Sequence, residues 1–172
     1  MTKRIVIMLA VALAAMCPAV AGAAAPPGLN EQDRTFLAQA HQANLAEIEA
    51  GRSAESRGAT ARVRELGSTL VRDHTKLDGD VRRSADKAGV QLPGSPDTRQ
   101  REQLAQVDAK SGKEYDRAWV AMEIAGHRQT LSAIAEEEKN GSSAEVKDLA
   151  AAAKPVVQKH LDLLQAAQKN GD

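Results

Sequence analysis

The sequence predicts an all-α fold, a ferritin-like antiparallel four-helix bundle with a long crossover between its second and third helices. Residues that favour helix dominate the chain, and aromatic residues make up only 2% of it. Apolar residues recur every three or four positions along four long segments, which is the spacing of an amphipathic helix. Between the second and third segments, residues 90–112 could run the length of a bundle. Such a crossover makes those two helices parallel and places the two tight turns at opposite ends.

Capping and turn residues delimit the first hairpin. Asn30 can cap the first helix, with Asp33 three residues later, and the chain is expected to turn at Arg57-Gly58. The second helix is expected over residues 59–88. Gly89 then ends it, because glycine readily adopts the left-handed conformation that closes many helices.

The crossover and the second hairpin carry their own signals. Residues 97–110 are expected to form a short polar helix within the crossover. The third helix should end at Asn140-Gly141, and Pro155 should kink the fourth, because proline lacks a backbone donor and crowds the preceding turn. Capping boxes are expected to start the third and fourth helices, formed by Ser111 with Glu114 and by Ser142 with Glu145.

The first residues of the chain indicate export. Residues 1–23 combine two basic residues, a short apolar run and small residues at a cleavage spacing, as a cleaved secretory signal peptide does. Residues 24–29 would then be a linker, and residues 30–170 the bundle domain. A membrane anchor is disfavoured because Pro18 interrupts the apolar run. Lipid anchoring at Cys17 is disfavoured because Met16, a large side chain, precedes it. The mature protein is therefore expected in the periplasm or outside the cell.

Charge and motifs exclude several classes of function. Removal of Lys3 and Arg4 with the signal leaves 21 of the 23 basic residues against 23 acidic ones, a net charge of −2. A nucleic-acid partner, which requires a basic face, is not expected. The sequence lacks a phosphate-binding loop, a nucleophile elbow and a zinc-protease motif. The sequence does not exclude a protein partner in the envelope, and it fits either a monomer or a dimer.

Four histidines form the candidate site, and each lies on the apolar stripe of one long helix. His74 follows His41 by 33 residues and His160 follows His127 by 33, so each pair should lie level within its hairpin. In the ferritin-like topology the pairs would stand about 10 Å apart along the bundle, too far to share one ion, whereas a crossover acting as a simple turn would bring all four together. Glu47 would reach the level of His127 and His160. The candidate metal ligands are His74, His127, His160 and Glu47, with His41 the weaker candidate.

Two interpretations of these histidines stay open. A lone histidine on an apolar stripe is more often a hydrogen-bonded core residue than a ligand. No Glu-x-x-His motif is present, so an oxygen-activating di-iron centre is not expected, and a nitrogen-rich site for copper, zinc or nickel is the remaining metal interpretation. Glu123 shares a helix face with His127 but could equally face solvent. Asp73 and the run Glu136-Glu137-Glu138 are expected to be solvated.

An ordered series of motifs resembles a known family. The series consists of VREL and VRDHT within residues 63–75, AGVQLP at 88–93, YDRAW at 115–119 leading to His127, and KP at 154–155 leading to His160-Leu161. It resembles a bacterial domain-of-unknown-function family of secreted proteins, commonly described as outer-membrane or periplasmic, over about residues 33–168. The resemblance implies a ferritin-like fold and marks Glu47, His74, His127 and His160 as family positions. Trp119 departs from the family's usual tyrosine, and His41 is not among its typical residues.

Three hypotheses of function follow from the sequence. The favoured one is a non-enzymatic periplasmic bundle with an envelope-stress or interaction role. The alternative is a transition-metal-binding or metal-buffering protein that uses the bundle-core histidines. A metal-dependent redox enzyme is the least favoured, because the sequence lacks the ligand motifs of the bundle oxidases.

Overall fold

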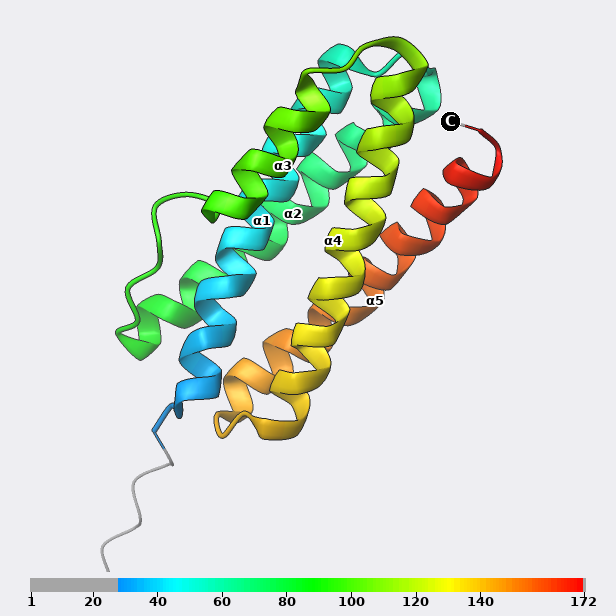
Figure 1. Ribbon diagram of the computed structural model, residues 1–172. Helices are drawn as coiled ribbons and strands as arrows, with labels where there is room; N and C mark the ends of the chain where they lie inside the picture. Colours follow the sequence, from blue (N-terminus) through cyan, green and yellow to red (C-terminus); the bar gives the residue numbers. More distant parts are fainter. Residues whose placement is uncertain (1–27, 172) are drawn as a thin grey trace, which may run out of the picture.

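The computed structural model describes residues 28–171, and within them every regular element is an α-helix (Figure 1). The predicted all-α class is confirmed. The helices are α1 (Glu31–Arg57), α2 (Ala61–Ala88), α3 (Thr98–Asp108), α4 (Gly112–Asn140) and α5 (Ala144–Lys169).

The four long helices form a bundle with the predicted ferritin-like connections. Each long helix has two principal neighbours, since α1 packs on α2 and α4, and α5 packs on α4 and α2. The α1–α2 turn and the α4–α5 turn lie at opposite ends, so α2 and α4 run parallel (Figure 1). The crossover returns the chain along the bundle, and its helix α3 packs against α4 and α1.

Helix α1 begins as the sequence predicts, whereas the starts of α4 and α5 differ. The Asn30 side chain and Asp33 form a capping box. Ser111 precedes α4 but its side chain makes no capping hydrogen bond, so the predicted capping box is absent. The Glu114 carboxylate instead accepts a hydrogen bond from Lys110 at 2.7 Å. Helix α5 is capped by Ser143, and the helix continues through Pro155.

A polar network ties the start of α1 to the α4–α5 turn. The buried Asp33 carboxylate accepts hydrogen bonds from the backbone N–H groups of Asn30, Ser142 and Ser143 and from the Ser142 hydroxyl. Because the Ser142 hydroxyl donates to Asp33, Ser142 does not form the predicted capping box with Glu145. Burial alone would raise the pKa of Asp33, but these hydrogen bonds outweigh it and hold the pKa at about 2. Glu137 is also fully buried in this region, contrary to the expected solvated run.

Helices α1 and α2 approach closely at a pair of glycines. A Cβ atom on Gly67 would stand 2.6 Å from the carbonyl oxygen of Gly51, and one on Gly51 would stand 2.8 Å from the carbonyl oxygen of Gly67. No side chain fits between backbones at this distance. The contact therefore fixes the spacing of α1 and α2.

Two apolar clusters fill the bundle, with a polar layer between them along the helices. The cluster toward the α1–α2 turn contains Ala54, Val63, Leu66, Leu70, Val107, Tyr115, Trp119, Val120, Ile124, Leu161, Leu164 and Ala167. The cluster toward the α4–α5 turn contains Phe36, Leu37, Val81, Ala85, Ile134, Val146, Ala150 and Val157. The buried side chains of Glu47, His74, His127 and His160 come from intermediate positions on the same helices.

The predicted signal peptide and Cys17 lie outside the described residues, as does the linker up to residue 27. Within residues 28–171, no helix combines the length and apolar character needed to cross a membrane.

Candidate metal centre

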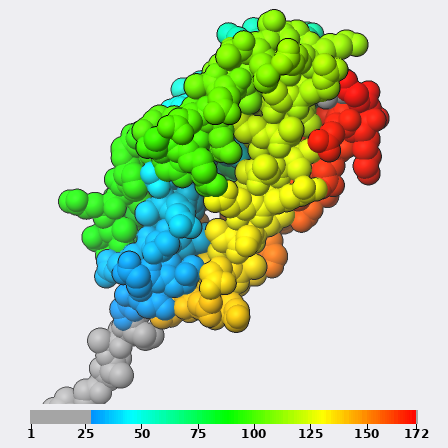
Figure 2. Space-filling model, viewed as in Figure 1, coloured from blue at the N-terminus to red at the C-terminus, as the bar shows by residue number. Residues whose placement is uncertain are grey.

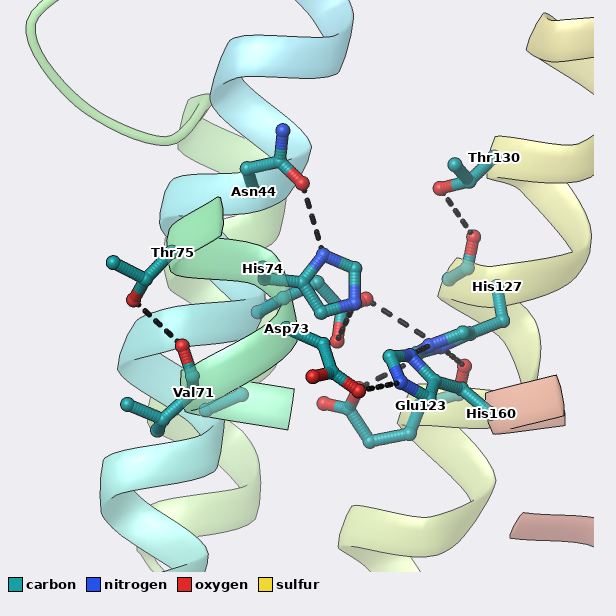
Figure 3. A network of polar contacts seen from close by, with 12 residues as sticks. Asn44, Val71, Asp73, His74, Thr75, Glu123, His127, Thr130 and His160 are labelled. Carbon is teal, nitrogen blue, oxygen red and sulfur yellow. Dashed lines mark hydrogen bonds and ion pairs between the residues drawn. The ribbon is translucent and has the colours of Figure 1, made fainter. Parts of the chain in front are cut away.

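Three histidines from three helices meet inside the bundle. His74 on α2, His127 on α4 and His160 on α5 have exposed fractions of 3%, 1% and 1%. Their ring centroids form a nearly equilateral triangle with sides of 5.3, 5.5 and 5.6 Å (Figure 3). The sequence predicted that His74 would lie about 10 Å along the bundle from His127 and His160. This expected separation is wrong.

His74 presents a bare nitrogen to the interior. Its Nδ1 lies 2.9 Å from Oδ1 of Asn44 (Figure 3). Because an amide oxygen only accepts, the neutral ring carries its hydrogen on Nδ1. Nε2 is then an unprotonated acceptor, and this buried atom has no hydrogen-bond partner in the described part of the chain.

The other two rings are held in the same manner. Nδ1 of His127 donates to the backbone carbonyl of Glu123 at 2.9 Å, and Nε2 of His160 donates to Oδ2 of Asp73 at 3.0 Å. The remaining atoms, Nε2 of His127 and Nδ1 of His160, face each other at 3.4 Å. With both outer nitrogens acting as donors, two lone pairs point at one another with no hydrogen between them.

This arrangement suits a transition metal ion. The three histidines offer ligand nitrogens that all lie within 4.8 Å of one another. Two nitrogens bound tetrahedrally at 2.0–2.1 Å from zinc would be about 3.3 Å apart, close to the separation of the facing pair. Metal-bound histidines usually donate their other N–H to a carbonyl or carboxylate, as His127 and His160 do here.

The protonation states also favour a cation. Burial lowers the pKa values of all three histidines, and for His74 the neighbouring histidines lower it further. Neutral imidazole is the form that binds metal, so the rings need not lose a proton at neutral pH.

Two buried carboxyl groups stand beside the histidines. Oε1 of Glu47 lies 3.5 Å from Nδ1 of His127, and Oε2 of Glu47 lies 4.0 Å from Nε2 of His74. Burial raises the pKa of Glu47 to about 7. Burial, and then the charge of Glu47, raise the pKa of Glu123 well above its usual range.

Glu47, Glu123 and His127 could form a second ligand set, because they too offer atoms within 4.8 Å of one another. Both carboxyl groups approach the ring through Nδ1 of His127. That nitrogen already donates to the Glu123 carbonyl. The trihistidine set, whose nitrogens are bare, is therefore the better centre, and Glu47 stands next to it rather than within it.

His41 lies outside this cluster. Its Nδ1 contacts Oδ1 of Asp78 at 2.5 Å, and both side chains are buried. The predicted level pairing of His41 with His74 is wrong, because α2 begins at Ala61, two residues later than expected, and the hairpin register shifts with it. The structure does place His127 and His160 level, as their 3.4 Å contact shows.

Two residues beside the histidines were not among the predicted metal ligands. Asp73, which was expected to be solvated, accepts a hydrogen bond from His160 on α5, while the neighbouring His74 points inward. Glu123 is 3% exposed rather than solvated. Its spacing of four residues from His127 was the available signal, since such residues share a helix face.

A cavity of about 310 Å³ reaches the cluster from outside. Its inner wall includes His74, Glu47 and Glu123, and apolar side chains such as Leu77 and Val157 line it further along. Exposed polar residues of α1, α3 and α4 form its rim, on the face where these helices meet in Figure 2. The cavity thus connects His74 and the two carboxyl groups with the rim.

Comparisons with known proteins agree with this architecture. A family model described as Domain of unknown function (DUF4142) matches residues 18–167. A crystal structure of a DUF305 fragment from Deinococcus radiodurans is similar to the chain, with a TM-score of 0.74 and 13% sequence identity. The similarity covers 84% of this chain and 99% of that one, and at this identity it shows the fold alone. No curated protein matches the sequence.

Proposed function

Because the chain belongs to the DUF4142 family, a family of unknown function, we propose its function from the site itself: it binds a divalent transition metal through His74, His127 and His160. One observation carries the proposal. Each of the three buried imidazoles has one nitrogen fixed as a donor and the other left bare, and the three rings offer nitrogens within 4.8 Å of one another.

The ligand chemistry narrows the choice of metal. Three neutral imidazoles suit copper, zinc and nickel, and on such a site copper(II) binds more tightly than the other two. Calcium and magnesium prefer oxygen ligands. Asp73 supports the site by accepting a hydrogen bond from the outer N–H of His160, which makes the other ring nitrogen a more basic metal ligand.

Thermal unfolding with added metal tests this proposal. The protein is stripped with a chelator and titrated separately with zinc, copper and nickel. At a hundredfold excess over its dissociation constant, one metal ion should add about 2.7 kcal/mol of stability and raise the midpoint by about 5–10 °C. Elemental analysis should give one ion per chain.

Two matched variants locate the site. His160→Ala should abolish the shift, whereas His41→Ala removes another buried histidine outside the cluster and should preserve it. Helical content measured by circular dichroism in the metal-free state checks that both variants fold. No shift with any of the metals would refute the proposal, as would equal loss in the two variants.

Two further elements of the function rest on the sequence. Export to the periplasm is supported by the signal-like residues 1–23, and N-terminal sequencing of the protein from a secretion host tests it. In the periplasm the centre would buffer or carry metal ions, a role that requires no catalysis. The non-enzymatic envelope-interaction role predicts instead a bundle whose stability is indifferent to metal, so the same titration decides between them.

A further inference from the structure

We propose that the trihistidine centre keeps one coordination position open to the cavity, and that this position takes a small neutral nitrogen or oxygen base that also carries a hydrogen-bond donor. The inference rests on the proposed metal centre and deepens it by naming the class of its exogenous ligand. Three observations support it: the number of protein ligands, the position of the cavity, and the unsatisfied acceptors on the cavity wall.

The protein supplies three ligands to the ion, not four. Glu47 lies beside His74 and His127, but it groups with Glu123 and His127 and not with the set of three histidines. Three protein ligands leave a position for water or substrate in a tetrahedral centre, whereas structural sites normally use four.

The free position faces the cavity. Of the three histidines, only His74 lines the cavity, and its bare Nε2 is the atom that would hold the metal. An ion bound there lies at the inner end of a space of about 310 Å³, which lies at the lower end of the range for small-molecule sites. The rim residues Gln39, Arg101 and Gln129 are exposed, so ligands can reach the rim from solvent.

The cavity wall selects the type of ligand. Glu47 and Glu123 line its inner part, and each keeps a buried Oε2 atom without a hydrogen-bond partner among the described residues. A buried acceptor without a donor is costly, so a ligand that brings an N–H or O–H gains affinity. An anion without an N–H or O–H, such as azide, leaves these oxygen atoms unpaired. Leu77 and Val157, further along the wall, accommodate a short apolar substituent.

Ligand titration of the metal-loaded protein tests the inference. The protein is loaded with cobalt(II) or copper(II), and its visible absorption is followed as imidazole, 1-methylimidazole or azide is added. Imidazole should shift the metal bands at saturation. 1-Methylimidazole, which coordinates but lacks the N–H, should bind about tenfold more weakly, because a hydrogen bond to a carboxyl group is lost. Azide should bind more weakly than imidazole.

A variant that narrows the cavity distinguishes this route from adventitious binding. Ala43 lines the cavity one turn from Glu47, so Ala43→Phe should weaken imidazole binding at least tenfold while leaving metal affinity unchanged. Ala135→Phe, on an exposed position of α4 outside the cavity, should change neither. If Ala43→Phe fails to fold by circular dichroism, Ala133→Leu on the α4 side of the cavity serves in its place.

The outcomes separate the two proposals. A protein that binds no metal overturns the metal centre and this inference together. A protein that binds metal through the three histidines but shows no spectral response to imidazole overturns the inference alone, as does imidazole binding that the cavity variant leaves unchanged. Preference for azide would refute the proposed ligand class.

Discussion

Substituting Gly67 by alanine tests how tightly α1 and α2 are packed. The added Cβ would stand 2.6 Å from the carbonyl oxygen of Gly51 and 2.9 Å from Cβ of Ala54. Ordinary contacts begin near 3.4 Å, so the helices must separate locally by roughly 0.8 Å. Overpacking of this kind costs about 3 kcal/mol at its upper range, and alanine regains about 1 kcal/mol of helix propensity. The net expectation is a loss of about 2 kcal/mol, or a midpoint lower by about 4–8 °C.

The same substitution elsewhere on α2 provides the control. A Cβ on Gly79 would meet only Nη1 of Arg83, the mobile end of a flexible side chain, at 3.5 Å. Gly79→Ala should therefore stabilise the protein by about 0.5–1 kcal/mol through helix propensity alone. Urea denaturation followed by circular dichroism and by the fluorescence of Trp119, the single tryptophan, measures both variants. Stabilisation by both substitutions would refute the close-packing argument.

Three further predictions concern carboxyl groups. Because the pKa of Asp33 is lowered to about 2, its carboxylate stabilises the folded protein above pH 3.8, and this stabilisation is lost as the pH falls through 2. Asp33→Asn should cost about 2–4 kcal/mol of folding stability at pH 7, measured by thermal denaturation. An unchanged midpoint would contradict this. Burial raises the pKa of Glu137 to about 7, so its stabilisation is complete below pH 4.5 and lost as the pH rises through 7. From the pKa difference this loss is about 3 kcal/mol, and Glu137→Gln should not show it; parallel pH profiles of variant and wild type would disprove the assignment. Asp73→Asn should weaken metal binding about 10–100-fold in a chelator competition while barely changing the metal-free midpoint, and undiminished affinity would remove Asp73 from the site.

The period of the apolar residues determined most of what could be predicted. It located the four long helices, and the length of the crossover indicated their directions. The register between helices was harder to predict. Helix α2 begins two residues later than expected, so His41 lies opposite Asp78 and not opposite His74. Helical periodicity assigns a residue to a face but does not specify its partner on the neighbouring helix.

The positions of the buried and partly buried acidic residues could be predicted least well from the sequence. Asp73, Glu123 and Glu137 have the residue types of a solvated surface, and a pattern based on hydropathy assigns them there. They contact the interior because partners distant in sequence meet them, such as His160 for Asp73 and Gln32 for Glu137. Ser142 and Ser143 are adjacent and chemically alike, so the sequence alone could not indicate that the hydroxyl of Ser142 would bind Asp33 and the hydroxyl of Ser143 would cap α5.

The division of the three histidines among helices has a consequence for folding. The α1–α2 hairpin holds one of them, and the α4–α5 hairpin holds two. Neither hairpin alone can assemble the set, so it forms only when the two hairpins dock. A metal ion bound by all three would then act as a crosslink between the hairpins. It would slow their separation, and hence unfolding, more than it would speed the collapse of either hairpin.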